Sequence, residues 1–188
     1  DKPGVYEVEW GVSIKEVLDM AGASNTQAVV VGGPSGNIIG EKDFSRRVCY
    51  SDLGTGGAFI IIGKDKDLLH IVHNFMDFFV EESCGWCVPC RAGNVLLLGK
   101  LEKIMDGKAS EKDLEEIDQW CTVVKDMSRC GLGQTSPNPI QTTLQNFKEL
   151  YLSKVKSGDD FVTEFDMAAA VQESCDAAGR TPNLEDHS

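Results

Sequence analysis

The first third of the chain alternates short apolar runs with polar and glycine-rich stretches. Residues 5–10 alternate apolar and polar side chains as a half-buried strand does, while residues 28–31 and 59–62 are apolar runs of strand length. Between the first two runs, Ser13 and Glu16 have the spacing of a capping box and introduce a short helix. The order strand, helix, strand, turn, strand predicts a small α+β unit such as a β-grasp domain.

Two glycine-rich stretches interrupt these runs. We expect the sequence GGPSG at residues 32–36 to form a turn in which Gly32, Gly33 and Gly36 take positive φ. The second stretch, at residues 54–57, precedes the third predicted strand. Neither matches the dinucleotide-binding or P-loop fingerprint, so we interpret both as turns rather than phosphate-binding loops.

After residue 64 the apolar residues recur with the period of a helix. This pattern predicts helices over residues 68–80 and 92–105, a third after Ser110 and a fourth that starts at Pro139. Because short connections favour antiparallel neighbours, the four helices predict a four-helix bundle. The side chains expected to face inward from the last three helices are Val95, Leu96, Leu98 and Leu101, then Leu114, Ile117, Trp120, Cys121 and Val124, then Ile140, Leu144, Phe147, Leu150 and Tyr151.

These patterns divide the chain into three parts. We expect a β-grasp domain over residues 1–64, a helical domain over residues 65–156 and an acidic C-terminal tail over residues 157–188. The tail holds eight acidic side chains against one arginine, which is typical of a solvated terminus or of a docking peptide for a basic partner. A helix around residues 167–178 is expected within it.

Composition narrows the class of protein further. The net charge of −12 argues against nucleic acid and anionic lipid as partners, and no apolar run reaches the roughly 18 to 20 residues of a membrane span. The chain begins Asp-Lys-Pro-Gly without a secretory signal, which predicts a processed product or a fragment. Seven cysteines, an odd number, favour a reducing compartment over a disulfide framework, and we expect a cytoplasmic protein.

The stretch ESCGWCVPCR at residues 82–91 places Cys84, Cys87 and Cys90 in a C-x2-C-x2-C row. Its glycine and proline predict a non-helical loop in which three thiolates can converge. Structural zinc usually takes two separated C-x2-C pairs, and the radical-SAM pattern has a longer first spacing. A C-x2-C-x2-C row with a remote fourth cysteine is typical of a [4Fe-4S] cluster. The row therefore predicts three ligands of such a cluster.

The fourth ligand must come from the remaining cysteines, which are Cys49, Cys121, Cys130 and Cys175. Cys121 falls on the apolar face of a predicted helix, Cys49 lies in the other domain and Cys175 lies in the tail. Cys130 follows a predicted helix and precedes Gly-Leu-Gly, which allows close approach to a cluster. We therefore predict Cys130 as the fourth ligand. With four thiolates bound, no iron is open to substrate, so the site is predicted to transfer single electrons.

Other interpretations of the same residues remain open. Arg91 and Arg129 adjoin two predicted ligands and either offset the negative charge of the cluster or face solvent. The domain could instead be a ligand- or partner-binding module whose metal site is structural. An enzyme with Cys84 as nucleophile is disfavoured, because His70 and His73 are more than two helical turns upstream of it.

Four stretches of the sequence carry a resemblance to a known family, namely GGPSG at 32–36, DLGTGGAFI at 52–60, ESCGWCVPCR at 82–91 and SRCGLGQTSPNPI at 128–140. Together they resemble the C-terminal half of the NADH-oxidising flavoprotein subunit. That subunit is shared by respiratory complex I and by soluble NAD(P)-linked hydrogenases and formate dehydrogenases. The resemblance covers residues 4–155 and implies an SLBB-like β-grasp domain followed by a four-helix bundle with one [4Fe-4S] cluster on Cys84, Cys87, Cys90 and Cys130.

The resemblance also implies a function. The sequence CGLGQTSPNP resembles the hydrogenase and diaphorase branch more than complex I, although the corresponding part of complex I or of an NAD-dependent formate dehydrogenase is an alternative. The family's flavin and NADH domain normally precedes the β-grasp unit, and nothing in this sequence corresponds to it. FMN and NAD(H) are therefore expected in a missing domain or a partner. Further iron–sulfur subunits are expected as the other partners, with no nucleic acid and no membrane insertion.

Overall fold

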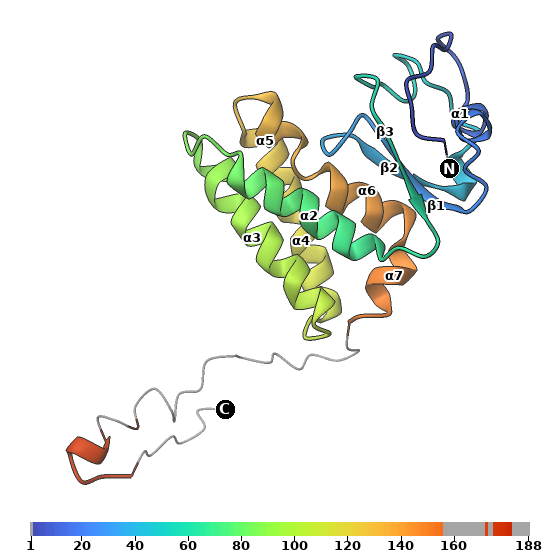
Figure 1. Cartoon of the computed structure of the whole chain (residues 1–188). Helices are drawn as coiled ribbons and strands as arrows, with labels where there is room; N and C mark the ends of the chain where they lie inside the picture. The colour runs from blue at the N-terminus through green and yellow to red at the C-terminus, as the bar shows by residue number, and fades with distance from the viewer. Residues whose placement is uncertain (1, 156–171, 173–174, 182–188) are drawn as a thin grey trace. The chain divides into compact units, whose positions relative to one another are not determined.

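The computed structural model describes residues 2–155, 172 and 175–181 of the 188-residue chain. It is a mixed α+β structure, as the sequence predicts, with a small antiparallel sheet followed by helices (Figure 1). The elements are, in order, α1 (Ile14–Met20), β1 (Thr26–Val31), β2 (Asn37–Gly40), the 3₁₀ turn η1 (Glu41–Asp43), β3 (Phe59–Gly63), α2 (Leu68–Glu81), α3 (Val88–Met105), α4 (Glu111–Met127), α5 (Gly131–Thr135), α6 (Asn138–Asn146) and α7 (Lys148–Leu152).

The chain divides into two units, residues 1–157 and 158–188. In the second unit, Gln172 Nε2 donates a hydrogen bond to Asp176 Oδ1 at 2.7 Å, and Gly179 has a φ of 63°. Most of the helix predicted over residues 167–178 lies outside the described residues. The predicted boundary between the parts 1–64 and 65–156 stays a prediction.

The sheet lies between α1 and the later helices. Its strands have the order β2-β1-β3, and both neighbours of β1 run antiparallel to it. Because successive side chains of a strand point to opposite faces, the central strand contributes to two cores. Val29 and Val31 pack in the core that includes α1, whereas Ala28 and Val30 pack in the core that includes the helices. All four side chains are fully buried.

Two of the three predicted strands are confirmed, as β1 and β3. The prediction of a strand over residues 5–10 is wrong. Val5 is fully exposed, and backbone hydrogen bonds with residues 46–48 begin only at Gly11. Trp10 stacks on Tyr50 instead, with ring centroids 5.2 Å apart. Alternation alone does not make a strand when no neighbouring backbone supplies hydrogen bonds. The sequence pattern also missed β2, which has only four residues.

The predicted turn after β1 is confirmed at two of its three glycines. Gly32 and Gly33 take positive φ, 103° and 73°. Gly36 does not, which corrects the prediction, and it is needed for another reason. A β-carbon at Gly36 would overlap the Val31 carbonyl, so glycine there permits a close approach of two backbone segments.

Two helices begin at capping boxes. Glu16 N–H donates to Ser13 Oγ at 3.2 Å, and Ser13 N–H donates to Glu16 Oε2 at 2.8 Å, which confirms the start of α1. At the start of α4, Ser110 N–H donates to Asp113 Oδ2 at 2.8 Å. Each box satisfies N–H groups that have no partner inside the helix.

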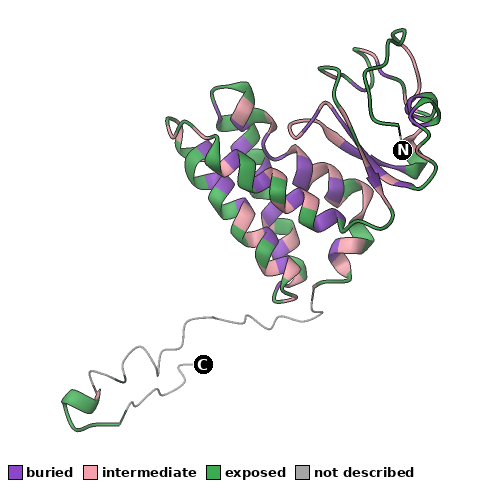
Figure 2. Cartoon of the chain, in the orientation of Figure 1, coloured by how far each residue is buried: buried purple, intermediate pink, exposed green. Residues whose placement is uncertain are grey.

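Helices α2, α3, α4 and α6 pack against one another around a shared apolar core. Their buried positions form inward-facing stripes, which Figure 2 shows in purple. In the part of the chain that the structure describes, none of the helices has the length and apolar character needed to cross a membrane.

The inward face of α3 differs from the predicted one. The helix starts at Val88 rather than near residue 92, and Val95 and Leu96 are 55% and 38% exposed. Its buried face instead includes Gly93 and Asn94. Because neither residue is hydrophobic, a search for apolar periodicity does not detect this face. Trp120 of α4, which was expected to be buried, is 40% exposed.

The single helix predicted from Pro139 is two helices, α6 and α7. They are separated at Phe147, whose φ of −134° and ψ of 40° are not helical. The ring of Phe147 lies against Gly40 of β2, where a β-carbon would come within 3.0 Å of Cζ. The short helix α5, which precedes them, was not predicted.

Helix α6 binds the outer edge of the sheet through side chains. Ile38 N–H of β2 donates to Thr142 Oγ1 at 3.0 Å, and Asn146 Nδ2 donates to the Ile38 carbonyl at 2.8 Å. Asn138 Nδ2 adds a bond to the Ser35 carbonyl at 2.7 Å. These bonds satisfy backbone groups that an edge strand would otherwise leave unpaired, and they connect the sheet to the helices.

Two glycines of α3 should respond in opposite ways to alanine. A β-carbon at buried Gly93 would overlap Val124 Cγ2 of α4, so we expect Gly93→Ala to lower the free energy of unfolding by about 1–3 kcal/mol. Gly99 is exposed, and a β-carbon there would meet no neighbouring atom within 4 Å, so Gly99→Ala should raise the free energy of unfolding by roughly 0.5–1 kcal/mol. Urea unfolding of both variants measures the difference, and equal effects would contradict the close packing of α3 on α4.

Candidate metal centre

The cysteine row occupies the junction between α2 and α3. Helix α2 is capped at Glu82, and Gly85 takes a φ of 75° that turns the chain. Cys87 is the N-cap of α3 and Cys90 lies in its first turn. The prediction that all three cysteines of the row lie in a non-helical loop is therefore wrong, because Cys90 lies within α3. Pro89 falls within the first helical turn, where its missing N–H would have had no intrahelical acceptor.

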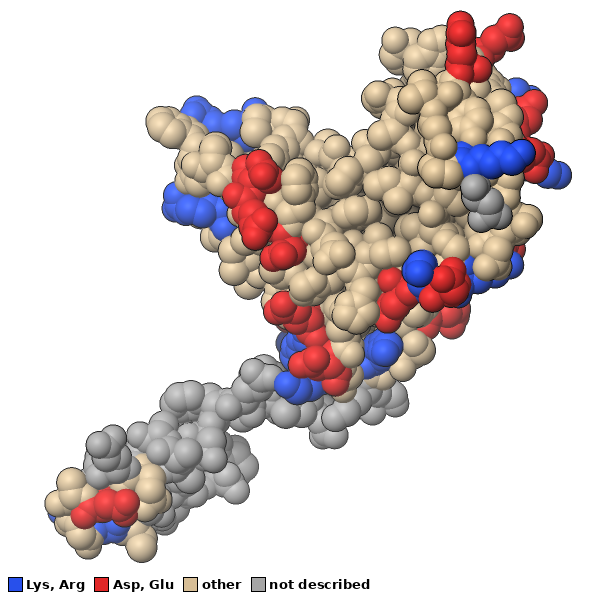
Figure 3. Space-filling view, in the orientation of Figure 1, with Lys and Arg blue, Asp and Glu red and all other residues tan. Residues whose placement is uncertain are grey.

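The loop before α3 folds back onto the first turn of the helix. Ser83 Oγ and Cys90 Sγ are 3.4 Å apart, and Gly85 N–H donates to Ser83 Oγ at 3.3 Å. Arg91 Nη1 donates to the Gly85 carbonyl at 2.6 Å. Arg91 therefore has a local structural contact while its side chain remains exposed, and Figure 3 shows basic side chains over this end of the helices.

The second cysteine stretch lies against the first through small residues. Cys130 is the N-cap of α5. Gly133 of α5 is buried, and a β-carbon there would come within 2.6 Å of Ser128 Cβ and 3.1 Å of Cys90 Cβ. Gln134 Nε2 donates to the Ser128 carbonyl at 3.0 Å and fixes the turn between α4 and α5. Residues 128–133 are thus packed on the first turn of α3.

The four predicted ligands differ in burial. Cys90 is 4% exposed, Cys87 is half-buried, and Cys84 and Cys130 are exposed. Among the residues that the structure describes, no three His, Cys, Asp or Glu side chains converge into a group that could hold a metal ion. The structure brings the two stretches together through Cys90, Ser128 and Gly133, and the four-thiolate set stays a prediction.

The residues around Cys90 fit a negatively charged sulfur centre. The Ser128 hydroxyl is buried and has no hydrogen-bond partner among the described residues, which costs roughly 1–3 kcal/mol. Asn94 Nδ2 already points at Cys90 Sγ, at 3.5 Å. The positive end of the dipole of α3, an 18-residue helix, also lies at this turn. A thiolate or inorganic sulfide here would meet the Asn94 amide and the Ser83 hydroxyl as donors.

The sequence pattern did not identify these donors. Asn94, Ser83, Ser128 and Ser136 are ordinary polar residues in the sequence. One signal was available, because Asn94 follows Cys90 by four residues and so lies on the same side of a helix.

Two cysteines outside the predicted set have distinct environments. Cys121 is fully buried, as its place on the apolar face of a predicted helix indicates, and burial raises the pKa of its thiol. A hydrogen bond with the Ser51 hydroxyl lowers the pKa of the Cys49 thiol, and the two side-chain atoms are 3.4 Å apart.

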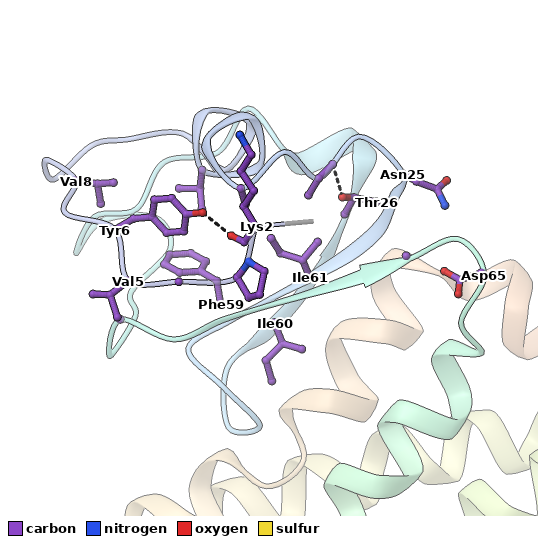
Figure 4. A pocket seen from close by; sticks show the side chains of 17 residues that line it. Lys2, Val5, Tyr6, Val8, Asn25, Thr26, Phe59, Ile60, Ile61 and Asp65 are labelled. Carbon is purple, nitrogen blue, oxygen red and sulfur yellow. Dashed lines mark hydrogen bonds between the residues drawn. The ribbon is translucent and has the colours of Figure 1, made fainter.

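A cavity of about 700 Å³ lies beside β3, and no cysteine lines it (Figure 4). Its walls come from residues 2–8, the end of α1 and β3, with Tyr6, Phe59 and Ile61 among the apolar side chains. Thr26 and Asp65 are among its few polar side chains. The cavity is therefore separate from the two cysteine stretches.

Residues 70–154 match the profile of the NADH-ubiquinone oxidoreductase-F iron-sulfur binding region, a [4Fe-4S] family. The matched segment contains both cysteine stretches. Residues 70–154 belong to this iron–sulfur family. The resemblance drawn from the motifs is confirmed, and the cofactor of this region is a [4Fe-4S] cluster.

Curated relatives of the iron–sulfur family span hydrogenases and NADH-quinone oxidoreductases. The chain is 51% identical over 172 residues to the NAD-reducing hydrogenase HoxS subunit alpha of Cupriavidus necator, covering 90% of this chain and 29% of that protein. It is 36% identical over 164 residues to the NADP-reducing hydrogenase subunit HndC of Solidesulfovibrio fructosivorans, covering 81% and 33%. It is 29% identical over 170 residues to an NADH-quinone oxidoreductase subunit of Rickettsia massiliae, covering 84% and 40%.

The fold matches that of a solved NAD+-reducing [NiFe]-hydrogenase. The crystal structure in the H2-reduced state superimposes with a TM-score of 0.82 at 30% sequence identity, covering 98% of this chain and 33% of that one. The chain thus spans between 29% and 40% of the length of these relatives.

Alkylation should separate the predicted ligands from the other thiols. In the metal-free chain we expect iodoacetamide to label exposed Cys84 and Cys130, whereas buried Cys121 should react only on unfolding. Cys49 should label as well, because its lowered pKa leaves more reactive thiolate near neutral pH. Peptide mass spectrometry gives the extent of labelling at each position.

Loading with the cluster should then protect Cys84, Cys87, Cys90 and Cys130 while Cys49 still labels at its earlier rate. Cys49 serves as the internal control for reagent access. If Cys130 labels equally fast with and without the cluster, the fourth ligand is elsewhere.

Proposed function

We propose that this chain is the electron-transfer portion of the diaphorase subunit of an NAD(P)-linked hydrogenase. The main support is that residues 128–133 pack directly on the first turn of α3. This packing brings the C-x2-C-x2-C row next to the stretch that contains Cys130. Two cysteine stretches about 40 residues apart thereby share one end of the helices, as the ligands of a single cluster require.

The proposal assigns Cys84, Cys87, Cys90 and Cys130 as the four thiolate ligands. It treats α2, α3, α4 and α6 as a four-helix bundle within residues 65–156, and residues 1–64 as an SLBB-like β-grasp domain. Residues 157–188 form the acidic tail, for which partner docking is one role. The mutual packing of the four helices and the bonds between α6 and β2 support this arrangement.

A bound [4Fe-4S] cluster supplies reversible one-electron transfer. The residues of this chain position it and offset its charge. Four thiolates fill the coordination positions, so no iron remains open to substrate. The first turn of α3 and the side chains around Cys90 provide hydrogen-bond donors, and Arg91 keeps the loop before α3 folded against that turn.

The proposed partners follow from the relatives named as hydrogenase and NADH-quinone oxidoreductase subunits. FMN and NAD(H) would bind outside residues 1–188, in a preceding domain or a partner. Further iron–sulfur centres of the complex would exchange electrons on the other side. The corresponding part of complex I or of a formate dehydrogenase is the alternative parent. A reducing location such as the cytoplasm keeps the ligand thiols available for metal.

Anaerobic reconstitution tests the cluster and its ligands together. We expect about four iron and four acid-labile sulfide atoms per chain, with an EPR signal on dithionite reduction. Cys130→Ala should lose most of the iron and the signal, because one coordination position has no replacement thiolate.

The matched control is Cys49→Ala, which removes a half-buried thiol outside the proposed set and should retain full iron content. One zinc per chain without sulfide would contradict the proposal and favour a structural metal site. Retention of iron in Cys130→Ala would reject the ligand assignment while leaving a cluster in place.

A further inference from the structure

Cys90 differs from the other three predicted ligands because donors surround its sulfur. Asn94 Nδ2 lies 3.5 Å from Cys90 Sγ, and Ser83 Oγ lies 3.4 Å from it. Cys90 is the buried member of the set, so its sulfur is shielded from water and depends on protein groups. A buried thiolate without donors would be strongly disfavoured.

The amide of Asn94 is oriented by a second buried side chain. Ser136 Oγ donates to Asn94 Oδ1 at 2.7 Å, and both residues are fully buried. With its oxygen occupied, Asn94 presents N–H rather than C=O to the sulfur. That orientation suits a thiolate, which accepts hydrogen bonds and has no proton to donate. The network therefore matches the deprotonated, ligating form of Cys90.

The Ser128 side chain lies in the same region. Its hydroxyl is buried and has no partner within the described residues. A β-carbon at Gly133 would come within 2.4 Å of Ser128 Oγ and within 3.1 Å of Cys90 Cβ. The Ser128 hydroxyl therefore occupies the space that a side chain at Gly133 would take, on the side of Gly133 that also faces Cys90. An acceptor supplied by a cluster at Cys90 would satisfy the hydroxyl.

We propose that Asn94, Ser128 and Ser83 are positioning residues that raise the reduction potential of the cluster through hydrogen bonds at the Cys90 side. This inference rests on the proposed function. Reduction adds one electron to the bound cluster, and no bond to Cys90 forms or breaks. Because the added charge spreads onto the sulfur ligands, donors stabilise the reduced form more than the oxidised form. Removing a donor should therefore lower the potential.

The decisive measurement is the midpoint potential of the reconstituted chain, followed by EPR during titration with dithionite. Asn94→Leu removes the donor at similar volume, and Ser136 keeps its bond to the Gly133 carbonyl at 3.2 Å. We expect the equilibrium constant for reduction to fall about tenfold, equivalent to ~59 mV for a one-electron couple. Ser83→Ala should shift the potential in the same direction, and Ser83→Thr, which keeps the hydroxyl, should restore it.

Ser128→Ala gives a second and independent readout. In the metal-free chain it removes a buried hydroxyl that has no partner among the described residues, so the urea midpoint should stay unchanged or rise. In the loaded chain the same substitution should lower the reduction potential. A merely structural role for Ser128 predicts the opposite pair of results, a lower urea midpoint and an unchanged potential.

Thr143→Val is the matched control. Thr143 is also buried and hydrogen-bonded, to Tyr151 Oη at 2.6 Å, but it lies in α6 and its other bonds go to the carbonyls of Pro139 and Ile140. It should lower stability without moving the potential. Wild-type potential retained by both Asn94→Leu and Ser128→Ala, with iron and sulfide intact, would overturn this inference and leave the proposed function standing. A wild-type chain that binds no iron and sulfide would overturn both.

Discussion

The close approach of α3 to residues 124–133 is the constraint on which the candidate site depends. Two glycines make it possible, since a side chain at Gly93 would overlap Val124 and one at Gly133 would overlap Ser128. Without that approach, the cysteine row at the start of α3 and the stretch around Cys130 would belong to separate surfaces. Glycine is unfavourable inside a helix, so its use at two packed positions is explained by the contact it allows.

The end of the helices that carries the cysteines has a buried side and a solvent-exposed side. Cys90 is buried among Asn94, Ser83 and Ser128, whereas Cys84 and Cys130 are exposed. The inner side of the site is therefore fixed by packing, and the outer side is accessible to solvent or to a neighbouring subunit. An electron-transfer centre needs both properties, because a fixed environment limits reorganisation while an exposed edge shortens the path to a partner.

The sequence was sufficient where local chemistry decides the structure. The capping box at Ser13, the cap at Ser110 and the turn at Gly32 and Gly33 all act over a few residues. It was insufficient where distant contacts decide. The buried face of α3 follows from Gly93 meeting Val124, and the break before α7 from Phe147 meeting Gly40. The spacing of Asn94 from Cys90 could have indicated one donor, but the bond from Ser136 that orients Asn94, and the place of Ser128 beside Gly133, depend on the tertiary fold.

The site has a buried side at Cys90 and an exposed side at Cys84 and Cys130. This difference affects how a reduction potential measured on the isolated chain is interpreted. Burial, donors and solvent all contribute to the potential of an iron–sulfur centre. In an isolated chain the exposed side meets water, whereas in a complex a partner would replace that water. The absolute value would therefore change on assembly. The contribution of Asn94 and Ser128 would persist, because both are buried within this chain and are held by its own helices. Differences between variants consequently report on this chain, even where the absolute potential belongs to the whole complex.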